Sequence, residues 1–482
     1  MSFESSKNSD IVFSRGYTLQ FSDVLNNNGT VRLINHIKND ESIVGLSIND
    51  RDFQCRIQQE FPSIIADLID LAVAIHAADR LTFQSLRQQQ TQIHVVLPVR
   101  HPEILNQSSF QDKLSSLLEW ATGSRWIFEF SKRVGLGRAV EQQPLLTSSD
   151  PYINEVALWS GGLDALAGLY TCLKENRQIA FMLFGSGSND NAYARQERIF
   201  QALLPSFPNR LNLCRVPIRF SESNLHIKNK ISRARGIVFT LLGSACAYLM
   251  GQQVLHLYEN GIGAVNLPYR KSAVGLDHSR SVHPLTLLRV SNLVSELVGE
   301  GFRVQNPFLF WTKAEMCQQL AKDMKYDLPA LTISCDSPHR KQPIQCGYCS
   351  SCILRKQALA ASRVEDKTHY IVPHGARPVS DIRLYLQNML TQVSTLKGLL
   401  NCSEGAVSQW ESLTRRFPEL DDIVDRTHEI EGLTPPEMRE NLIRLYQTYV
   451  LEWDAVEPQI SGDFLSQVID QPITQDFQMA IQ

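Results

Sequence analysis

The feature that most constrains the fold is a series of short apolar runs between residues 153 and 365, each followed by a helical or turn-like segment. The runs are Val156–Trp159, Ile179–Phe184, Leu211–Ile218 and Val254–Leu257. Strands that are apolar on both faces are typical of a parallel sheet with helices on both sides. The series therefore predicts an α/β fold with a doubly wound parallel sheet, in which ligands bind at the carboxyl ends of strands.

The chain has 482 residues, which is too long for one ordinary core, and we predict three domains. Residues 1–150 combine strand-like runs with helices, which indicates an N-terminal α+β domain. Residues 151–365 hold the parallel sheet and the motifs that carry chemistry. Residues 366–482 have the periodicity of a C-terminal helical region.

Several elements outside the parallel sheet are predicted from periodicity and from end signals. The expected strands are Tyr17–Phe21, Val31–Ile34, Gln92–Val99 and Arg125–Phe130. The expected helices are Ser63–Ala78, Ile382–Leu400 and Pro435–Trp453. The last of these has a defined start, because Thr434 is a cap residue and Glu437 completes a capping box.

Composition and charge exclude several classes of protein. Hydrophobic residues make up 43% of the chain and charged residues 20%, which is the balance of a soluble globular protein. The formal charge of −3 gives no general basic field, so direct nucleic-acid binding is not indicated. The start of the chain lacks a signal-peptide pattern, and the longest apolar stretch, 236–251, is shorter than the roughly 18 residues of a membrane span. We expect a cytoplasmic protein without membrane contact.

The segment Ser160–Asp164 (Ser-Gly-Gly-Leu-Asp) lies between a predicted strand and a predicted helix. Its glycines let the backbone approach an anion closely, and amides at the helix start attract negative charge. Ser160 adds a hydroxyl donor, and Asp164 is suited to bind magnesium or to steady the loop. The pattern predicts a phosphate site, although Ser-Gly-Gly sequences are also common in purely structural turns. The chain has no Walker A pattern, and Gly185–Asp190 lacks the third glycine of a dinucleotide fingerprint.

Four of the ten cysteines lie within eighteen residues: Cys335, Cys346, Cys349 and Cys352. This spacing suits a tetrahedral structural zinc site, and Gly347 permits the tight turn that it requires. His339 is an alternative ligand. A redox pair and an iron–sulfur cluster are alternative uses, although the ferredoxin spacing needs a further cysteine followed by proline. A closed site of four thiolates leaves no open position for chemistry.

These two motifs, in this order, resemble those of QueC, the 7-cyano-7-deazaguanine synthase family. Arg235-Gly236 is similar to the Arg-Asn pair that opens the equivalent helix of that family. Thr312–Glu315 is similar to its Thr-Lys-Ala-Glu helix start, and Cys346–Arg355 to its C-G-x-C-x-x-C-x-x-R ending. The resemblance covers residues 153–360.

The resemblance implies a PP-loop (HUP-like) ATP pyrophosphatase domain that uses ATP and Mg²⁺ and carries structural Zn²⁺. ATP would adenylate the carboxylate of 7-carboxy-7-deazaguanine and release pyrophosphate, and an amine would then attack the activated acyl group. The ATP-binding residues that it implies are Leu158, Ser160, Gly161, Gly162, Leu163, Asp164, Ala165 and Arg235. It assigns no catalytic or base-reading residue to this chain.

Three segments depart from the family pattern. Ala165 stands where the family usually has serine. Ser188–Gln196 replaces a Tyr-Gly-Gln-Arg-His-type segment, of which it keeps only a tyrosine, an arginine and a glutamine. Glu259–Pro284, where the deazapurine is expected, has little in common with the family beyond its start.

The terminal regions look like those of longer QueC-like proteins in bacterial anti-phage systems, including Qat and type IV CBASS operons. That resemblance implies ligation of a deazaguanine to the N-terminal amine of a partner protein encoded nearby. Two other functions remain open: a housekeeping 7-cyano-7-deazaguanine synthase that uses ammonia, and a non-catalytic nucleotide-binding sensor whose loop has decayed at Ala165. A tRNA sulfurtransferase is a further PP-loop function, but its usual additional reactive cysteines and RNA-binding domain are not visible.

Overall fold

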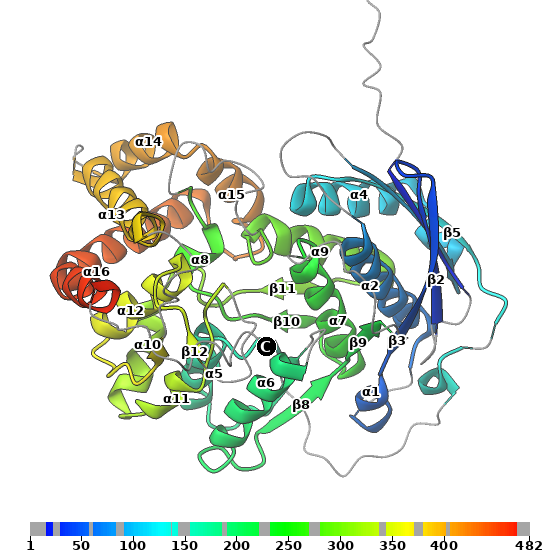
Figure 1. Ribbon diagram of the computed structural model, residues 1–482, viewed down its shortest axis with the longest axis horizontal. Coiled ribbons are helices and arrows are strands. Elements are labelled where there is room, and N and C mark those ends of the chain that lie inside the picture. Colours follow the sequence, from blue (N-terminus) through cyan, green and yellow to red (C-terminus); the bar gives the residue numbers. More distant parts are fainter. Residues whose placement is uncertain are drawn as a thin grey trace, which may run out of the picture.

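The computed structural model describes residues 16–22, 29–56, 61–82, 91–135, 137–142, 155–185, 190–220, 232–268, 280–336, 344–370, 379–401 and 405–469. An N-terminal sheet lies at one end of the molecule, a parallel sheet lies in the middle, and C-terminal helices lie at the other end (Figure 1). Within these ranges, no helix is both long enough and apolar enough to cross a membrane.

The N-terminal sheet has six strands, and its expected elements are present. In spatial order they are β5 (Arg125–Lys132), β4 (Gln92–Val99), β1 (Tyr17–Phe21), β2 (Gly29–Asn35), β3 (Asp40–Ile48) and β9 (Ile218–Phe220). The first three strands run parallel, and the remaining pairs are antiparallel. The helical elements of this region are α1 (Arg51–Arg56), α2 (Ser63–Leu81), α3 (Pro102–Leu105), α4 (Ser108–Thr122) and the 3₁₀ turn Ala139–Gln142.

The second sheet is entirely parallel, as the apolar runs predict. In spatial order its strands are β11 (Arg303–Gln305), β10 (Val254–His256), β6 (Glu155–Leu158), β7 (Phe181–Gly185) and β8 (Leu211–Arg215). The first strand in the sequence, β6, is therefore central, and the chain extends the sheet first on one side of it and then on the other. The carboxyl end of β6 next to β10 is the point where this direction reverses, which is where such sheets bind ligands.

Helices cover both faces of the parallel sheet. Val156 and Leu158 of β6 share a core with α7 (Arg235–Leu249) and α9 (Pro284–Val298). Ala157, between them, faces the opposite core, because successive strand side chains point to opposite faces. That opposite core is formed by α5 (Leu163–Glu175), α6 (Asp190–Leu203) and α10 (Lys313–Lys322).

One predicted strand is wrong in its extent. The run Leu211–Ile218 was expected to form a single strand, but β8 ends at Arg215 and the chain then enters the N-terminal sheet as β9. Pro217 separates the two strands, and proline cannot donate the amide hydrogen bond that a continued strand requires. Its carbonyl instead accepts from the Asn49 amide at 2.9 Å. A segment from the middle of the sequence thus completes the N-terminal sheet.

The remaining elements lie around the carboxyl side of the parallel sheet and at the C-terminal end. They are α8 (Gly261–Val265), α11 (Asp327–Ala330), β12 (Ile344–Gln345), α12 (Ser350–Ala361), β13 (His369–Tyr370), α13 (Val379–Asn401), α14 (Ala406–Arg416), α15 (Glu419–Thr427) and α16 (Pro435–Ile469). The capping box at Thr434 is confirmed, since the Thr434 amide donates to Glu437 Oε2 at 2.7 Å. The predicted boundary at residue 150 lies outside the described residues, and the division into three domains stays a prediction.

Candidate functional site

The turn after β6 carries the residues predicted to contact phosphates. Gly161 has φ +76°, in the left-handed region that glycine enters without steric penalty. The Gly162 amide donates to Ser160 Oγ at 3.2 Å, and the Ser160 residue is exposed. α5 begins at the next residue, so its first amides face this turn without acceptors inside the helix. The turn thus has the backbone geometry of an anion-accepting loop.

Three predicted ATP-binding residues point their side chains into the core. Leu158, Leu163 and Ala165 expose only 7%, 0% and 4% of their surface. Only their backbone groups are available to a ligand at the turn. Their ATP-binding role stays a prediction, as do those of Ser160 and Gly161.

Asp164, in the first turn of α5, is held by side chains from two other elements. Lys313 Nζ lies 2.7 Å from Asp164 Oδ2, and Asn260 Nδ2 donates to Oδ1 at 3.0 Å. Lys313 is the first residue of α10, and Asn260 follows β10 and caps α8. All three side chains are buried. A buried ion pair at the switch point of a parallel sheet occurs either at a site for a charged ligand or in a structural ion-pair network.

Glu259 adds a second carboxyl group beside this pair. Its Oε1 accepts from Asn260 Nδ2 at 2.7 Å. Burial, followed by the charge of Asp164, raises the pKa of Glu259 to about 8, and the Lys313 ammonium opposes this effect. A carboxyl group whose pKa lies near neutrality can hold or accept a proton under physiological conditions.

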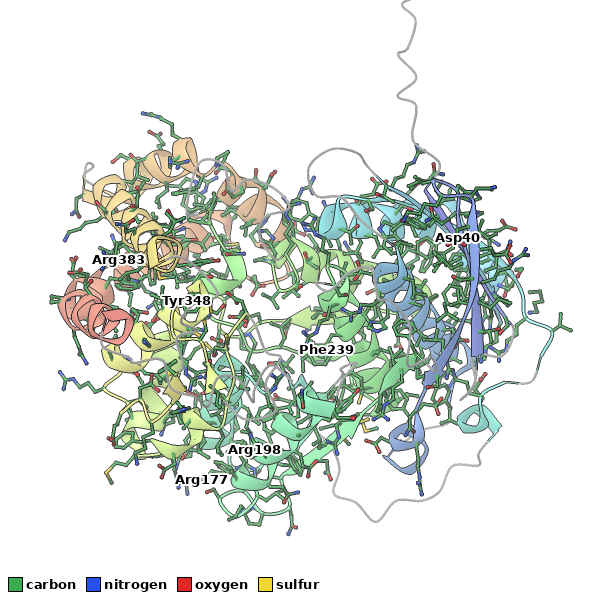
Figure 2. All side chains as sticks on the ribbon, in the orientation of Figure 1. Asp40, Arg177, Arg198, Phe239, Tyr348 and Arg383 are labelled. Carbon is green, nitrogen blue, oxygen red and sulfur yellow. The ribbon has the colours of Figure 1, made fainter. Side chains whose placement is uncertain are left out.

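Arginines from two helices bring positive charge to the same edge of the sheet. Arg195 and Arg198 lie on α6, and the exposed Arg235 opens α7; Figure 2 labels Arg198. Burial, and then the charges of Arg235 and Arg198, lower the pKa of Arg195, so both of these guanidinium groups act on that of Arg195. The Cβ of Arg195 would lie 3.6 Å from a Cβ added at Gly161, which places this cluster beside the turn. Gathered positive charges favour a polyanionic ligand.

Gln196 adds a buried polar side chain beside the turn. Its Oε1 is buried and has no hydrogen-bond partner among the described residues. The backbone carbonyl of the same residue accepts from Trp159 Nε1 at 3.1 Å, and a Cβ at Gly185 would lie 2.3 Å from Oε1. The side chain is therefore packed against the ends of β6 and β7, and a water, a ligand or a residue outside the described ranges would have to supply the missing donor.

The four clustered cysteines converge as predicted. Their sulfur atoms all lie within 4.8 Å of one another, all four residues are buried, and none forms a disulfide. The Cys346 and Cys352 sulfurs are 3.8 Å apart. Four thiolates at about 2.3 Å from a tetrahedral zinc ion would be about 3.8 Å apart, so the set fits Zn²⁺.

The backbone around the cysteines is fixed by a glycine and by a buried arginine. Gly347 has φ +79°, which confirms the tight turn expected there. Arg355, fully buried on α12, donates to Thr332 Oγ1 at 2.7 Å, to the Pro329 carbonyl at 2.5 Å and to Thr368 Oγ1 at 2.8 Å. It thereby ties α12 to the strand-like segment that leads into Cys335. His339, the alternative ligand, lies outside the described residues.

One backbone hydrogen bond joins the cysteine site to the glycine turn. The Ile333 amide donates to the Gly161 carbonyl at 3.2 Å. Ile333 lies two residues before Cys335. The conformation of the cysteine segment therefore affects the position of the glycine turn.

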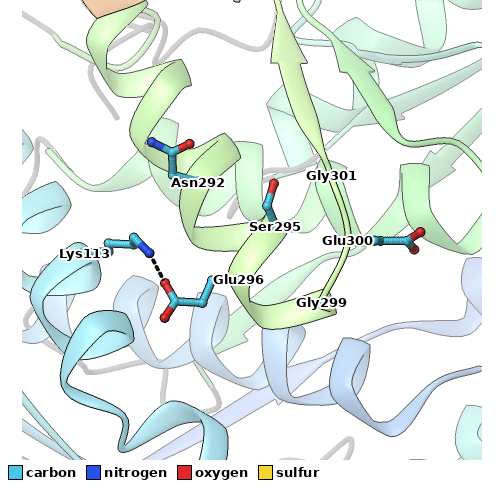
Figure 3. A pocket seen from close by; sticks show the side chains of 7 residues that line it. All are labelled: Lys113, Asn292, Ser295, Glu296, Gly299, Glu300 and Gly301. Carbon is cyan, nitrogen blue, oxygen red and sulfur yellow. Dashed lines mark hydrogen bonds and ion pairs between the residues drawn. The ribbon is translucent and has the colours of Figure 1, made fainter.

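A surface groove beside α9 lies away from these groups (Figure 3). Its lining residues are Lys113, Asn292, Ser295, Glu296, Gly299, Glu300 and Gly301. Residues 299–301 lead into the amino end of β11, whereas the turn follows the carboxyl end of β6. In a parallel sheet the amino ends and the carboxyl ends of the strands lie on opposite sides, so the groove is not part of the candidate site.

The fold and the site define a class: an α/β protein with a glycine turn at the switch point of a parallel sheet, and a separate cluster of four cysteines that fits a metal ion. The family described as queuosine biosynthesis protein QueC matches residues 285–363. The 7-cyano-7-deazaguanine synthases of Pseudomonas aeruginosa (strain LESB58) and Pseudomonas putida (strain W619) are 36% and 35% identical over 85 residues. This stretch is 17% of the chain, and the chain spans only 36% of the length of these relatives.

Residues 285–363 are therefore similar to QueC, which confirms this part of the resemblance inferred from the motifs. The matched residues 285–363 include Lys313 and all four cysteines of the cluster. The glycine turn at residues 160–164 lies outside the match, as do both terminal regions.

Proposed function

We propose that the chain is a PP-loop enzyme that uses ATP to activate the carboxylate of a 7-carboxy-7-deazaguanine-type base and transfers the acyl group to an amine. The observation that carries this proposal is the Asp164–Lys313 pair beside the Gly161 turn, at the switch point of a parallel sheet. Lys313 belongs to the segment that matches QueC, and its partner Asp164 belongs to the predicted ATP loop. The ion pair thus joins the matched segment to the loop.

In the proposed reaction the turn receives the phosphates of ATP. The amides at the start of α5, the Ser160 hydroxyl and the arginines of α6 and α7 would stabilise the negative charge of the pyrophosphate leaving group. Asp164 is the residue suited to hold Mg²⁺, which would neutralise part of the phosphate charge. The carboxylate oxygen of the base attacks the α-phosphorus of ATP, and pyrophosphate departs.

The second step needs the amine in its neutral, unprotonated form. The amine nitrogen attacks the acyl carbon, AMP departs with the electron pair of the broken C–O bond, and the nitrogen loses a proton. Glu259 lies beside Asp164 and is the group whose pKa, raised to about 8 by burial and by Asp164, suits it to accept that proton. Zn²⁺ at the four cysteines would hold structure only, because the four thiolates fill its coordination shell.

The proposed amine is the N-terminus of a partner protein in an anti-phage system. Supporting this are the terminal regions, residues 1–150 and 366–482, which fall outside the match to QueC and add surface suited to a macromolecular acceptor. Ammonia is the smaller alternative, and it would make the chain a housekeeping nitrile synthase.

The test is mass spectrometry of the purified protein with MgATP, 7-carboxy-7-deazaguanine and either ammonia or the products of neighbouring genes. We expect pyrophosphate release together with a mass gain on one of the neighbouring proteins. An amide or nitrile of the base without a protein adduct would show that ammonia, and not a protein, is the amine acceptor. Nucleotide binding without any turnover would favour the sensor, and no nucleotide binding would refute the proposal.

A further inference from the structure

The C-terminal helix α16 holds both members of the capping box that begins α10. Within the box, the Thr312 amide donates to Glu315 Oε2 at 2.8 Å, and the Glu315 amide donates to Thr312 Oγ1 at 3.1 Å. From α16, Glu452 Oε1 accepts the Thr312 hydroxyl at 2.5 Å, and Arg444 Nη1 donates to Glu315 Oε1 at 2.7 Å. Two side chains of one helix thus hold the two ends of the box.

Lys313 lies inside that box. Its backbone is bounded by Thr312 and Glu315, and its buried side chain extends to Asp164 Oδ2 at 2.7 Å. A lysine side chain has four rotatable bonds, so the position of its ammonium group depends on how firmly its backbone is held. Contacts that fix the start of α10 therefore fix the cation at the candidate site.

The same helix also touches the element that carries Asn260. A Cβ added at Gly261, the next residue, would lie 2.6 Å from Leu445 Cδ2 of α16 and 2.0 Å from the Leu309 carbonyl. The Gly261 amide donates to the Trp311 carbonyl at 2.8 Å. Both partners of Asp164 thus begin elements that are in contact with α16.

We propose that Glu452 and Arg444 are positioning residues that place Lys313 for nucleotide binding. The inference rests on the proposed function, since it assigns the ammonium group of Lys313 to the phosphates of ATP. It adds a role for α16, which lies outside residues 285–363, the part that matches QueC. The C-terminal region then acts on the reaction from within the chain, in addition to any surface that it offers to a partner.

The mechanism of this control is geometric. Glu452 Oε2 also accepts from Gln357 Nε2 of α12 at 3.2 Å, so one carboxylate joins α10, α12 and α16. Without it, the Thr312 cap keeps only its contact within the box, and the start of α10 is free to shift. A displacement of about 1 Å at a group that contacts the ligand can lower affinity or rate by up to about 100-fold.

The experiment measures the Kd of MgATP by calorimetry, in the absence of the base, for Glu452→Ala, Arg444→Ala and the double variant. The matched control is Asp454→Ala, because Asp454 also lies on α16 and pairs with a lysine of another helix, Lys397 of α13, at 2.7 Å. We expect Kd to rise about tenfold in each single variant and to stay within about twofold in the control. Glu452→Gln keeps an oxygen for the Thr312 hydroxyl and should restore most of the affinity.

Thermal unfolding of the same variants separates positioning from general stability. Binding is measured at a temperature at which every variant is folded, and the inference is refuted if Glu452→Ala lowers the Tm but leaves Kd equal to that of the control. If Glu452→Ala does not fold, Arg444→Ala and Glu452→Gln carry the same test. A wild-type protein that does not bind MgATP would refute the proposed function itself, which is a different result from a wild type that binds and variants that bind equally well.

Discussion

The glycine turn and the four-cysteine site are joined by the hydrogen bond from Ile333 to Gly161, yet they are built in opposite ways. Around the turn, like charges are gathered at Arg195 and its neighbours, two carboxyl groups adjoin, and an acceptor of Gln196 is unanswered within the described residues. Around the cysteines, four ligands close on one another, and a buried arginine makes several hydrogen bonds. The first arrangement suits a turn that accepts a ligand at a cost in local stability, and the second suits a site that holds the chain in place.

The comparison predicts its largest effect at the cysteine site. Cys352→Ser, or removal of metal with a chelator, should abolish most of the stabilisation that a structural zinc ion supplies, which is on the order of 10 kcal/mol of binding free energy in small domains. The Tm should fall sharply and should recover when zinc is restored after chelation. Elemental analysis and thermal unfolding check this, with Cys246→Ala as the control, since Cys246 is buried outside the cluster. A protein that contains no zinc when purified and keeps its Tm would contradict a structural metal.

The next effect is expected at the turn, and there it should appear in activity. Asp164→Asn should lower the rate of pyrophosphate release by about 10²–10³-fold, the range found when one charge-stabilising group is removed from an active site. The Tm should change little, because Glu259, which senses the same Lys313 charge, can ionise and take over the pairing. Asp323→Asn is the control, since Asp323 pairs with Lys174 at 2.8 Å on the far end of α5. Equal activity of the two variants would show that Asp164 has no role in the reaction.

A third variant tests whether the arginine beside the cysteines is structural. Arg355→Ala should lower the free energy of unfolding by about 3 kcal/mol, because it leaves buried groups such as Thr332 and Thr368 without their donor. Chemical denaturation measures the loss, and Arg415→Ala, at an exposed position of α14, serves as the control. If activity falls while stability is unchanged, the separation between a structural and a chemical site fails.

The smallest effect is a dependence of stability on pH at Glu259. Its pKa is raised from the ordinary value of 4.5 to about 8, so its contribution to stability is complete below about pH 4.5 and is lost as the pH rises towards 8. Wild type should therefore lose up to about 1 kcal/mol per pH unit relative to Glu259→Gln across this window. Unfolding curves at pH 5.5, 6.5 and 7.5, chosen as about evenly spaced points in the window, test the slope. Relative to Glu41→Gln, wild type should show no such loss in this window, because the hydrogen bond from Arg32 lowers the pKa of Glu41.

Much of the fold follows from sequence patterns that act over short distances. β1 and β4 begin and end where alternation of apolar residues predicts, and the parallel sheet follows from strands that are apolar on both faces. The strand that fails, Leu211–Ile218, shows the limit of this reasoning. The apolar pattern continues through Pro217, but the missing amide hydrogen lets the chain leave one sheet for the other.

The candidate site was only partly predictable, for a physical reason. The glycine turn and the cysteines are each contained in a short stretch of sequence, so their spacing reveals them. Asn260 and Lys313, by contrast, lie 96 and 149 residues from Asp164, and only the strand order brings the three together. The segment Thr312–Glu315 is recognisable as a helix start, but nothing in its sequence indicates that Lys313 pairs with Asp164.

The crossing of the chain at Pro217 also affects how the protein can be made. Among the described residues, β3 pairs on its outer side with β9 through Leu46–Ile48, so these three residues have no outer partner until residue 220 has emerged from the ribosome. Open edges expose unpaired amides and carbonyls that other strands can join. A fragment that ends at residue 150 would leave Leu46–Ile48 unpaired at this edge, whereas one that continues through residue 220 would pair them with β9.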